Sequence, residues 1–262
     1  MKFQFKKYLR HVPIVKRIYP SLFFKILKKI KKKKIVYKFQ DILLELNIDE
    51  PMDRSILFFD YYENEQINYL KLKMQKNKYD YFLDIGANSG LYSLVVASLN
   101  KSINVLAFEP IKKTFLKLKK NIKLNKLKNI EIFNFGLSNT NQIKKVKALK
   151  KNNYIQTGGF GVVNVGEDTK NLHIEKAIFK IGDHKFNFVQ KKIYIKIDVE
   201  GHEIFVIEGL LKLIKNNNVF LQIEIFKNNY NSVLAKLKSL KFVKVYEIND
   251  DTKKDYFFKK KI

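Results

Sequence analysis

Short apolar segments that end in an acidic residue alternate along this chain with longer segments of helical periodicity. Tyr81-Phe82-Leu83-Asp84 is followed by a glycine-containing loop and by the apolar stretch from Leu91 to Leu99. The same unit repeats from Ile103 to Phe108, which precedes Glu109, and continues with a helical stripe from Ile111 to Leu127. Strands that alternate with helices favour βαβ units and a parallel sheet. The chain is therefore expected to adopt an α/β fold.

The alternation continues to the carboxyl end and predicts a Rossmann-like, mostly parallel sheet of seven strands. Helices are expected on both of its faces, and an antiparallel hairpin is expected to close it. The further strands are predicted at 130–135, 193–197, 219–225, 242–248 and 256–260, and the further helices at 42–46, 65–74, 203–215 and 230–240.

Three parts of the chain differ in composition and periodicity. Residues 1–40 read as a basic amphipathic amino-terminal segment, and residues 41–262 as the α/β domain. Within that domain, residues 139–191 lose the regular alternation and are expected to form an insertion on the substrate side, with short antiparallel strands. Gly158-Gly159-Phe160-Gly161 lies in its middle. This segment is either a mobile substrate loop or a plain tight turn.

The formal net charge of +27 favours an anionic partner such as nucleic acid, a membrane surface or an acidic substrate. A bias toward Lys, Asn and Ile, as an AT-rich genome produces, explains the charge equally well for the residues after position 41. The absence of cysteine excludes disulfide scaffolds, cysteine-ligated metal sites and thiol nucleophiles.

The first forty residues carry no Asp or Glu and interleave Lys with apolar side chains. Such a segment either lies on an anionic bilayer through residues 1–34 or is packed or solvated. No uncharged run approaches the roughly 20 residues of a membrane-spanning helix, and no signal-peptide core is present. We therefore expect a cytoplasmic protein, with peripheral contact at the inner face of the membrane as an alternative.

Polar residues fall at the ends of the predicted strands, where an open α/β sheet binds its ligands. These residues are Asp84, Glu109, Gly136, Asp198 and Glu224. After the first strand, glycines at positions 86 and 90 let the backbone turn tightly beside a ligand. The loop lacks the close glycine pair of dinucleotide-binding sites, so a ligand without phosphates is favoured. Glu109 follows the second strand. Its distance along the chain from the glycine loop is that at which a carboxylate accepts hydrogen bonds from both ribose hydroxyls of a nucleoside.

The chain resembles the FkbM-type methyltransferases through three motifs between about Tyr61 and Phe226. They are Phe82-Leu83-Asp84-Ile85-Gly86-Ala87-Asn88-Ser89-Gly90, Phe108-Glu109-Pro110 and Ile195-Lys196-Ile197-Asp198-Val199-Glu200-Gly201-His202-Glu203, of which the last is the most particular. The resemblance implies a class I methyltransferase fold, S-adenosylmethionine as cofactor, and O-methylation of sugar or polyketide hydroxyls. It further implies cofactor contacts from Asp84, Gly86, Asn88 and Gly90 to the amino-acid end, from Glu109 to the ribose, and from Gly136 to Ser138 to the adenine.

The third motif also supplies the candidate catalytic residues. A hydroxyl nucleophile gains from a base beside the reacting methyl group. Asp198 and Glu200 are equal candidates for that base, and His202 ranks behind them. Glu203 is expected only to complement the following helix dipole. Asp198 with Glu224 is an alternative pair of oxygen ligands for a divalent cation, and no metal site is assigned.

The leading hypothesis is an O-methyltransferase that acts on a hydroxyl of a sugar, a surface glycan or a lipid-linked saccharide. Methylation of RNA or another nucleic acid is the first alternative, because of the charge. It is not favoured, since the chain has Asp198-Val199-Glu200-Gly201 where base-amine methyltransferases commonly have Asn or Asp followed by Pro-Pro-aromatic. A scaffold without catalytic activity is the second alternative.

Overall fold

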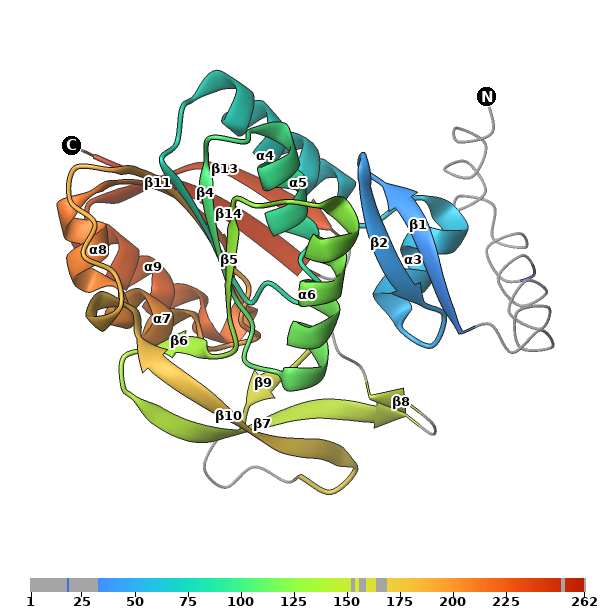
Figure 1. Ribbon diagram of the computed structural model, residues 1–262. Helices are drawn as coiled ribbons and strands as arrows, with labels where there is room; N and C mark the ends of the chain where they lie inside the picture. Colours follow the sequence, from blue (N-terminus) through green and yellow to red (C-terminus); the bar gives the residue numbers. More distant parts are fainter. Residues whose placement is uncertain are drawn as a thin grey trace.

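The computed structural model describes residue 18 and residues 33–151, 154–155, 159–163, 169–250 and 253–261. A seven-stranded sheet with the order β13-β14-β12-β11-β3-β4-β5 forms the main domain (Figure 1). Its strands are β3 (Tyr81–Ile85), β4 (Asn104–Phe108), β5 (Ile130–Phe133), β11 (Lys192–Ile197), β12 (Asn218–Glu224), β13 (Phe242–Asp250) and β14 (Lys253–Lys260).

The strands from β5 to β12 pair in parallel, whereas β14 is antiparallel to β12 and β13 is antiparallel to β14. The chain adds β4 and β5 on one side of β3 and then returns to add β11 on the other side. Ligands of open α/β sheets bind at such a reversal, beside the carboxyl ends of the strands. The sheet confirms the predicted fold class, including its closing antiparallel hairpin.

Helices cover both faces of the sheet, as predicted. One face carries α4 (Asn64–Lys76), α5 (Leu91–Leu99) and α6 (Lys112–Asn125), and the other carries α7 (Glu203–Gly209), α8 (Leu211–Asn216) and α9 (Tyr230–Ser239). Successive strand residues supply the two cores, because Phe82 and Tyr194 pack on the first side and Leu83 and Ile195 on the second. All four side chains are fully buried. Burial of each large apolar side chain contributes about 1.5–3 kcal/mol, which explains why the central strands are continuous apolar runs.

The helix predicted from Glu203 to Lys215 is two helices. The break lies at Leu210, whose backbone has φ −120° and ψ 19°. Just before it, Gly209 lies so close to the backbone that an added Cβ would be 2.0 Å from the carbonyl oxygen of Ser138. Short 3₁₀ turns, η1 (Gly182–His184) and η2 (Lys227–Asn229), precede β11 and α9.

The helix predicted at residues 42–46 is wrong, because these residues form strand β2 (Ile42–Asn47). It pairs antiparallel with β1 (Lys34–Phe39), and helix α3 (Pro51–Phe59) follows. Side chains at alternate positions of β2 are buried, and a window of five apolar residues fits a strand as well as a helix. Asn121 and Asn125 of α6 hydrogen-bond the backbone of β2. The hairpin thus joins the end of the predicted segment 1–40 to the main domain.

The segment predicted as an insertion forms a second sheet below the first in Figure 1. Its strands are β6 (Gly136–Ser138), β7 (Gln142–Lys151), β8 (Tyr154–Ile155), β9 (Gly161–Val162) and β10 (Leu172–Ile181). The expectation of short antiparallel strands is wrong in length, because β7 and β10 form a long antiparallel hairpin. The strand predicted at 130–135 also ends earlier, at Phe133, and the chain then leaves the main sheet so that β6 pairs with β10.

Some predictions fall outside the described residues. They include the amphipathic character of residues 1–17 and 19–32, the glycine at position 158 and the tip of the closing hairpin at 251–252. Within the part of the chain that the structure describes, no helix combines the length and the apolar character that crossing a membrane requires.

Candidate active site

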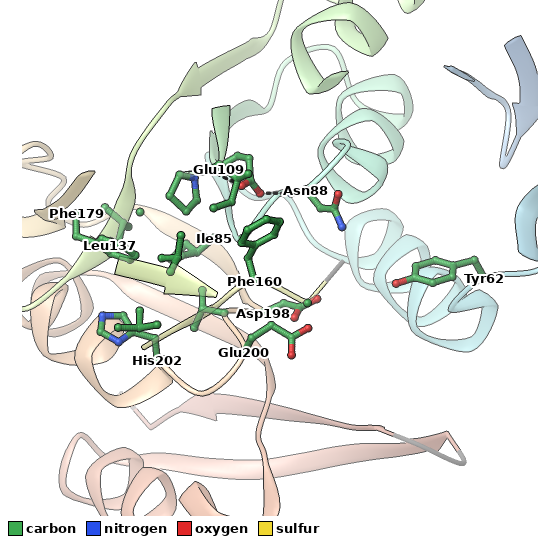
Figure 2. Close-up of a pocket in the computed structure, with 18 residues that line it drawn as sticks. Tyr62, Ile85, Asn88, Glu109, Leu137, Phe160, Phe179, Asp198, Glu200 and His202 are labelled. Atoms are coloured by element: carbon green, nitrogen blue, oxygen red, sulfur yellow. Dashed lines mark hydrogen bonds between the residues drawn. The ribbon is translucent and has the colours of Figure 1, made fainter. Parts of the chain in front are cut away.

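A pocket lies at the carboxyl ends of β3 and β11, where the strand order reverses (Figure 2). Small-molecule sites are commonly found at such reversals of strand order. The wall of this pocket comes from the loops after β3, β4 and β11 and from the second sheet, including β6. The lining residues are Tyr62, Ile85, Gly86, Asn88, Glu109, Pro110, Ile111, Gly136, Leu137, Val146, Gly159, Phe160, Val162, Phe179, Asp198, Val199, Glu200 and His202.

The loop after β3 is fixed by close backbone contacts. Gly86 has φ +85°, and an added Cβ would lie 1.8 Å from the carbonyl oxygen of Asp198. Only glycine fits this position, because β3 and β11 approach each other here as their loops begin. Asn88 follows with φ 49°, and both residues line the pocket. Glycine is therefore required at position 86, as predicted, because two strand ends come into contact there.

Glu109 holds the loops after β3 and β4 together. Its two carboxylate oxygens accept the backbone N–H groups of Asn88, at 2.9 Å, and of Ile111, at 2.8 Å. Burial raises the pKa of Glu109 to about 7, although these two N–H groups oppose the rise. A carboxylate offers about four acceptor positions, so two hydroxyl donors in the pocket still find acceptors on this side chain.

Asp84 lies behind the pocket wall and caps helix α5. One carboxylate oxygen accepts the Ser93 backbone N–H at 3.0 Å and the Ser93 hydroxyl at 2.6 Å. The other oxygen, Oδ1, is buried and has no hydrogen-bond partner among the described residues. Burial raises the pKa of Asp84, against the opposing effect of Lys196. Asp84, for which a direct contact to the ligand was predicted, is therefore not among the residues that line the pocket.

Gly90 and Ser138 also lie outside the lining of the pocket. An added Cβ at Gly90, which has φ +89°, would lie 2.3 Å from a methyl group of Leu118 in α6. Ser138 is fully buried, and its hydroxyl lies 3.0 Å from Nε2 of His202. Ser138 supports the wall that Gly136, Leu137 and His202 present to the pocket, whereas Gly90 allows the loop to pack closely against α6.

A buried lysine holds the first residue of the loop after β11. Nζ of Lys196 lies 2.9 Å from Oδ2 of Asp198 and 4.4 Å from the ring centroid of Tyr92. Burial lowers the pKa of Lys196, but Asp198, Asp84 and Glu63 more than offset this effect, so the net pKa is raised. The ammonium is therefore charged and fixes the Asp198 carboxylate at the pocket floor.

Glu200 lies in a turn with two successive left-handed residues, φ 51° at Glu200 and φ +98° at Gly201. Oxygen atoms of Asp198, Glu200 and Glu224 lie within 4.8 Å of one another. Hard divalent cations prefer carboxylate oxygens, so Asp198 and Glu200 of the pocket lining, together with the buried Glu224 behind them, could hold such an ion. Asp198 and Glu200 face the pocket from below Phe160 in Figure 2. The structure thus adds Glu200 to Asp198 and Glu224, which were considered as a pair of oxygen ligands.

His202 lines the pocket as a neutral side chain. Burial, and then the nearby Lys144, lower the pKa of His202 to about 3. Its ring stacks on Phe205 at a centroid distance of 4.6 Å and meets the edge of Phe179 at 5.4 Å. Glu203 lies in the first turn of α7, as the helix-dipole prediction places it, and it also accepts the Gly201 N–H at 2.7 Å, which holds the loop before the helix. His202 therefore ranks below the two carboxylates as a proton acceptor.

Tyr62 contributes to the pocket although no pattern in the sequence pointed to it. It precedes α4, and its hydroxyl points toward Asp198 and Glu200 in Figure 2. Burial, Glu63 and Asp198 raise the pKa of Tyr62 well above its ordinary value, so the hydroxyl keeps its proton. Tyr62 lies in the short loop between α3 and α4, which carries no periodic signal, and only the tertiary structure brings it to the pocket.

Phe160 reaches the pocket from the predicted glycine-rich segment. It packs against the small apolar cluster of Ile111, Val146, Ala177 and Phe179, and its ring lies above Asp198 in Figure 2. The neighbouring Gly161 also approaches the loop after β11 closely, because a Cβ added to it would lie 3.1 Å from the carbonyl oxygen of Glu200. This close approach ties β9 to the loop after β11. Gly159 and Phe160 of this segment therefore line the same pocket as Asp198 and Glu200.

The pocket fits a nucleoside cofactor without phosphates. Glu109 offers acceptors for ribose hydroxyls, while Ile111 and Leu137 give flat apolar walls for a base. Oδ1 of Asp84 remains unpartnered close to the same loop and suits a cationic ammonium group in its neighbourhood. No lysine or arginine lines the pocket within the described residues, which agrees with a ligand that carries no phosphate.

Comparisons with known proteins identify a family. The family model described as a methyltransferase FkbM domain matches residues 84–244, which include all three motifs of the sequence from Asp84 onward. A search of curated proteins gave no match. Methyltransferases that carry this domain use S-adenosylmethionine, and the residues that line the pocket suit the nucleoside of that cofactor.

Solved structures with a similar fold share little sequence with this chain. A ribosomal protein L11 methylase from Lactobacillus delbrueckii subsp. bulgaricus has 12% identity and a TM-score of 0.47, over 77% of this chain and 81% of that one. M. jannaschii TYW2 in complex with AdoMet has 12% identity and a TM-score of 0.47, over 87% of each chain. An O-methyltransferase from Thermotoga maritima has 12% identity and a TM-score of 0.46, over 79% of this chain and 70% of that one.

Proposed function

This chain belongs to the FkbM methyltransferase family, and from that premise we propose that it transfers the methyl group of S-adenosylmethionine to a hydroxyl of a sugar. The sugar is free, part of a surface glycan, or linked to a lipid. The observation that carries this proposal is the shared position of Phe160, Tyr62, Asp198 and Glu200 around one pocket.

Those four side chains offer the chemistry that recognises carbohydrate. The aromatic faces of Phe160 and Tyr62 suit the apolar C–H face of a sugar ring. The carboxylates of Asp198 and Glu200 accept hydrogen bonds from sugar hydroxyls. A nucleic-acid acceptor would meet two or three carboxylates here, which repel its phosphates. The acids of the pocket therefore favour the neutral polyol over the polyanion.

The transfer needs an acceptor oxygen in line with the carbon–sulfur bond of the cofactor. When bound, S-adenosylmethionine supplies a methyl group on a positively charged sulfur. The acceptor oxygen forms a bond to the methyl carbon as the carbon–sulfur bond breaks, and the bonding electrons stay with sulfur. The hydroxyl proton passes to a carboxylate of the pocket. Orientation of the two reactants supplies most of the acceleration.

Glu200 is the carboxylate that takes this proton in our proposal. Asp198 forms an ion pair with the buried Lys196, and an ammonium partner favours the charged carboxylate and weakens it as a proton acceptor. Asp198 is thus better suited to orient the acceptor. The neutral His202 is held by Ser138 and two aromatic rings, so it forms part of the wall.

The test is methyl transfer by the purified full chain with isotopically labelled S-adenosylmethionine. The acceptor panel contains free sugars, lipid-linked saccharides, polysaccharide and RNA. We expect label on a carbohydrate oxygen, located by mass spectrometry and NMR, and no label on RNA. Label found only on RNA or on nitrogen would overturn the proposal. Failure of the cofactor to bind, measured by calorimetry, would instead favour a scaffold.

A further inference from the structure

The β7–β10 hairpin has one face that belongs to the pocket and one face that points away from it. On the inner face, Val146 and Phe179 are buried and line the pocket. On the outer face, Ile143, Leu149 and Ile178 are 67%, 51% and 48% exposed. Isolated exposed apolar residues are ordinary, but three on the two strands of one hairpin form a shared surface.

The pairing of the two strands arranges this outer face in rungs. Ile143 is opposite Ile178, and Leu149 is opposite Leu172. Between these apolar rungs, Lys145 is opposite Lys176 and Lys147 is opposite Ile174. The described outward residues of β7 and β10 include no Asp or Glu. The outer face is therefore aliphatic at both ends and cationic in the middle.

The central rung has an unfavourable pairing of its own. Like charges that are directly opposite on neighbouring strands destabilise a sheet. Lys145 and Lys176 are both exposed. Water therefore screens the repulsion between the two ammonium groups, but neither of them supplies the opposite charge that would remove it. An anionic surface laid against this rung would remove the repulsion, and the aliphatic rungs on either side would be withdrawn from water.

We infer that the outer face of the β7–β10 hairpin docks on an anionic lipid bilayer. Aliphatic side chains beside lysines are the composition of membrane-surface segments, in which the apolar groups enter the acyl boundary and the lysines meet the headgroups. A single-stranded nucleic acid would need aromatic faces for base stacking. None of the described outward residues of this hairpin is aromatic. The lipid surface is therefore the better match.

This docking would hold the pocket beside the bilayer, because the same two strands form one of its walls. It differs from membrane contact through residues 1–34, since it uses folded strands and aliphatic side chains. It is also separate from the acceptor proposal, because vesicle binding is measured without any methyl transfer.

The experiment is flotation of the full chain with phosphatidylcholine vesicles that contain either no phosphatidylglycerol or about 30 mol% of it. Two double variants are compared with the unmodified protein: Ile143→Ser with Ile178→Ser, and Lys145→Gln with Lys176→Gln. The matched apolar control is Val243→Ser with Val245→Ser on strand β13, where both residues are also exposed. The matched charge control is Lys78→Gln with Lys101→Gln. These two exposed lysines precede β3 and β4, at the amino ends of the strands and thus away from the pocket.

We expect binding to the anionic vesicles, and a loss of about tenfold or more for each hairpin variant. The controls should bind as the unmodified protein does, and cofactor binding should be unchanged in all variants. Equal flotation of the serine variant and its control would overturn the inference. So would loss of RNA binding in the glutamine variant together with unchanged vesicle binding by both hairpin variants, because that result assigns the lysines to nucleic acid.

Discussion

The two halves of the pocket are built in different ways. The half that we propose for the cofactor, called the cofactor half, consists of Gly86, Asn88 and Glu109, from two neighbouring strand-to-helix loops that hydrogen-bond each other directly. The half that we propose for the acceptor, called the acceptor half, consists of Tyr62, Phe160, Asp198 and Glu200, and these come from three segments that are distant in sequence. The first half is set by local backbone geometry, whereas the second depends on how the helices and the second sheet pack over the strand ends.

The difference also concerns charge. In the cofactor half, the two oxygens of Glu109 are held by backbone N–H groups. In the acceptor half, carboxylate oxygens of Asp198 and Glu200 come within 4.8 Å of each other and of the neighbouring Glu224, and Lys196 balances one of these acids. Such an arrangement costs stability, because like charges that lie close together in a partly buried site repel. We infer that the cofactor half is tuned for binding and the acceptor half for chemistry.

Glu200→Gln tests this division most severely. Removal of the general base should lower kcat by about 10²–10⁴-fold, while the dissociation constant of S-adenosylmethionine stays unchanged. Calorimetry and steady-state kinetics give the two values. His202→Asn serves as the control in the same wall. A kcat close to that of the unmodified protein would remove Glu200 from the chemistry and shift the base to Asp198.

Glu109→Gln should have the converse effect. Loss of a charged acceptor for the ribose hydroxyls should weaken cofactor binding between about tenfold and a hundredfold. The effect on kcat at saturating cofactor should be much smaller. If both parameters fall by the same factor, the two halves of the pocket are not separable in the way that their construction indicates.

The raised pKa of Glu109 adds a pH test of the cofactor half. Hydroxyl donors bind the ionised carboxylate better, so cofactor affinity should rise with pH between about pH 6 and pH 8. The pKa of the folded protein, about 7, is above the ordinary value of 4.5. The folded apo protein therefore holds this proton more tightly and loses stability as the pH rises from 4.5 to 7. Both dependences should vanish in Glu109→Gln, as calorimetry and thermal melting would report.

Phe160→Ala sharpens the comparison from the side of the acceptor. Loss of one aromatic face should raise the KM for a sugar acceptor by up to about tenfold and leave cofactor affinity unchanged. Phe188→Ala is the matched control, because Phe188 stacks on Tyr81 at the other end of β3. An unchanged acceptor KM would show that Phe160 only closes the wall.

The smallest effect on turnover is expected from His202→Asn. The pKa of His202 is lowered from 6.5 to about 3, so the ring is neutral in the folded protein. The unfolded chain binds the proton more tightly, and the folded protein should therefore lose stability as the pH falls from 6.5 to 3. The variant should lose less stability over this range. Denaturant unfolding at several pH values measures the difference.

The motif residues of the cofactor half could be predicted because their roles are local. Gly86 must be glycine, since strand ends meet there, and Glu109 follows its strand directly. Asp84 and Gly90 of the same motif are not among the residues that line the pocket, and both hold the loop in place. Asp84 caps α5 and Gly90 packs on α6. A sequence motif does not distinguish a residue that touches the ligand from one that fixes the backbone around it.

Sequence periodicity by itself determined the α/β class, the seven-stranded sheet, its closing hairpin and the presence of polar residues at the strand ends, where the pocket lies. These features follow from burial on both sheet faces and from the reversal of strand order. Only the tertiary structure decided that residues 42–47 form a strand, that Tyr62 reaches the pocket, and that Glu200 joins the predicted pair of Asp198 and Glu224. Those features depend on contacts between segments far apart in the chain, where strand register and helix packing select the neighbours and local propensity does not.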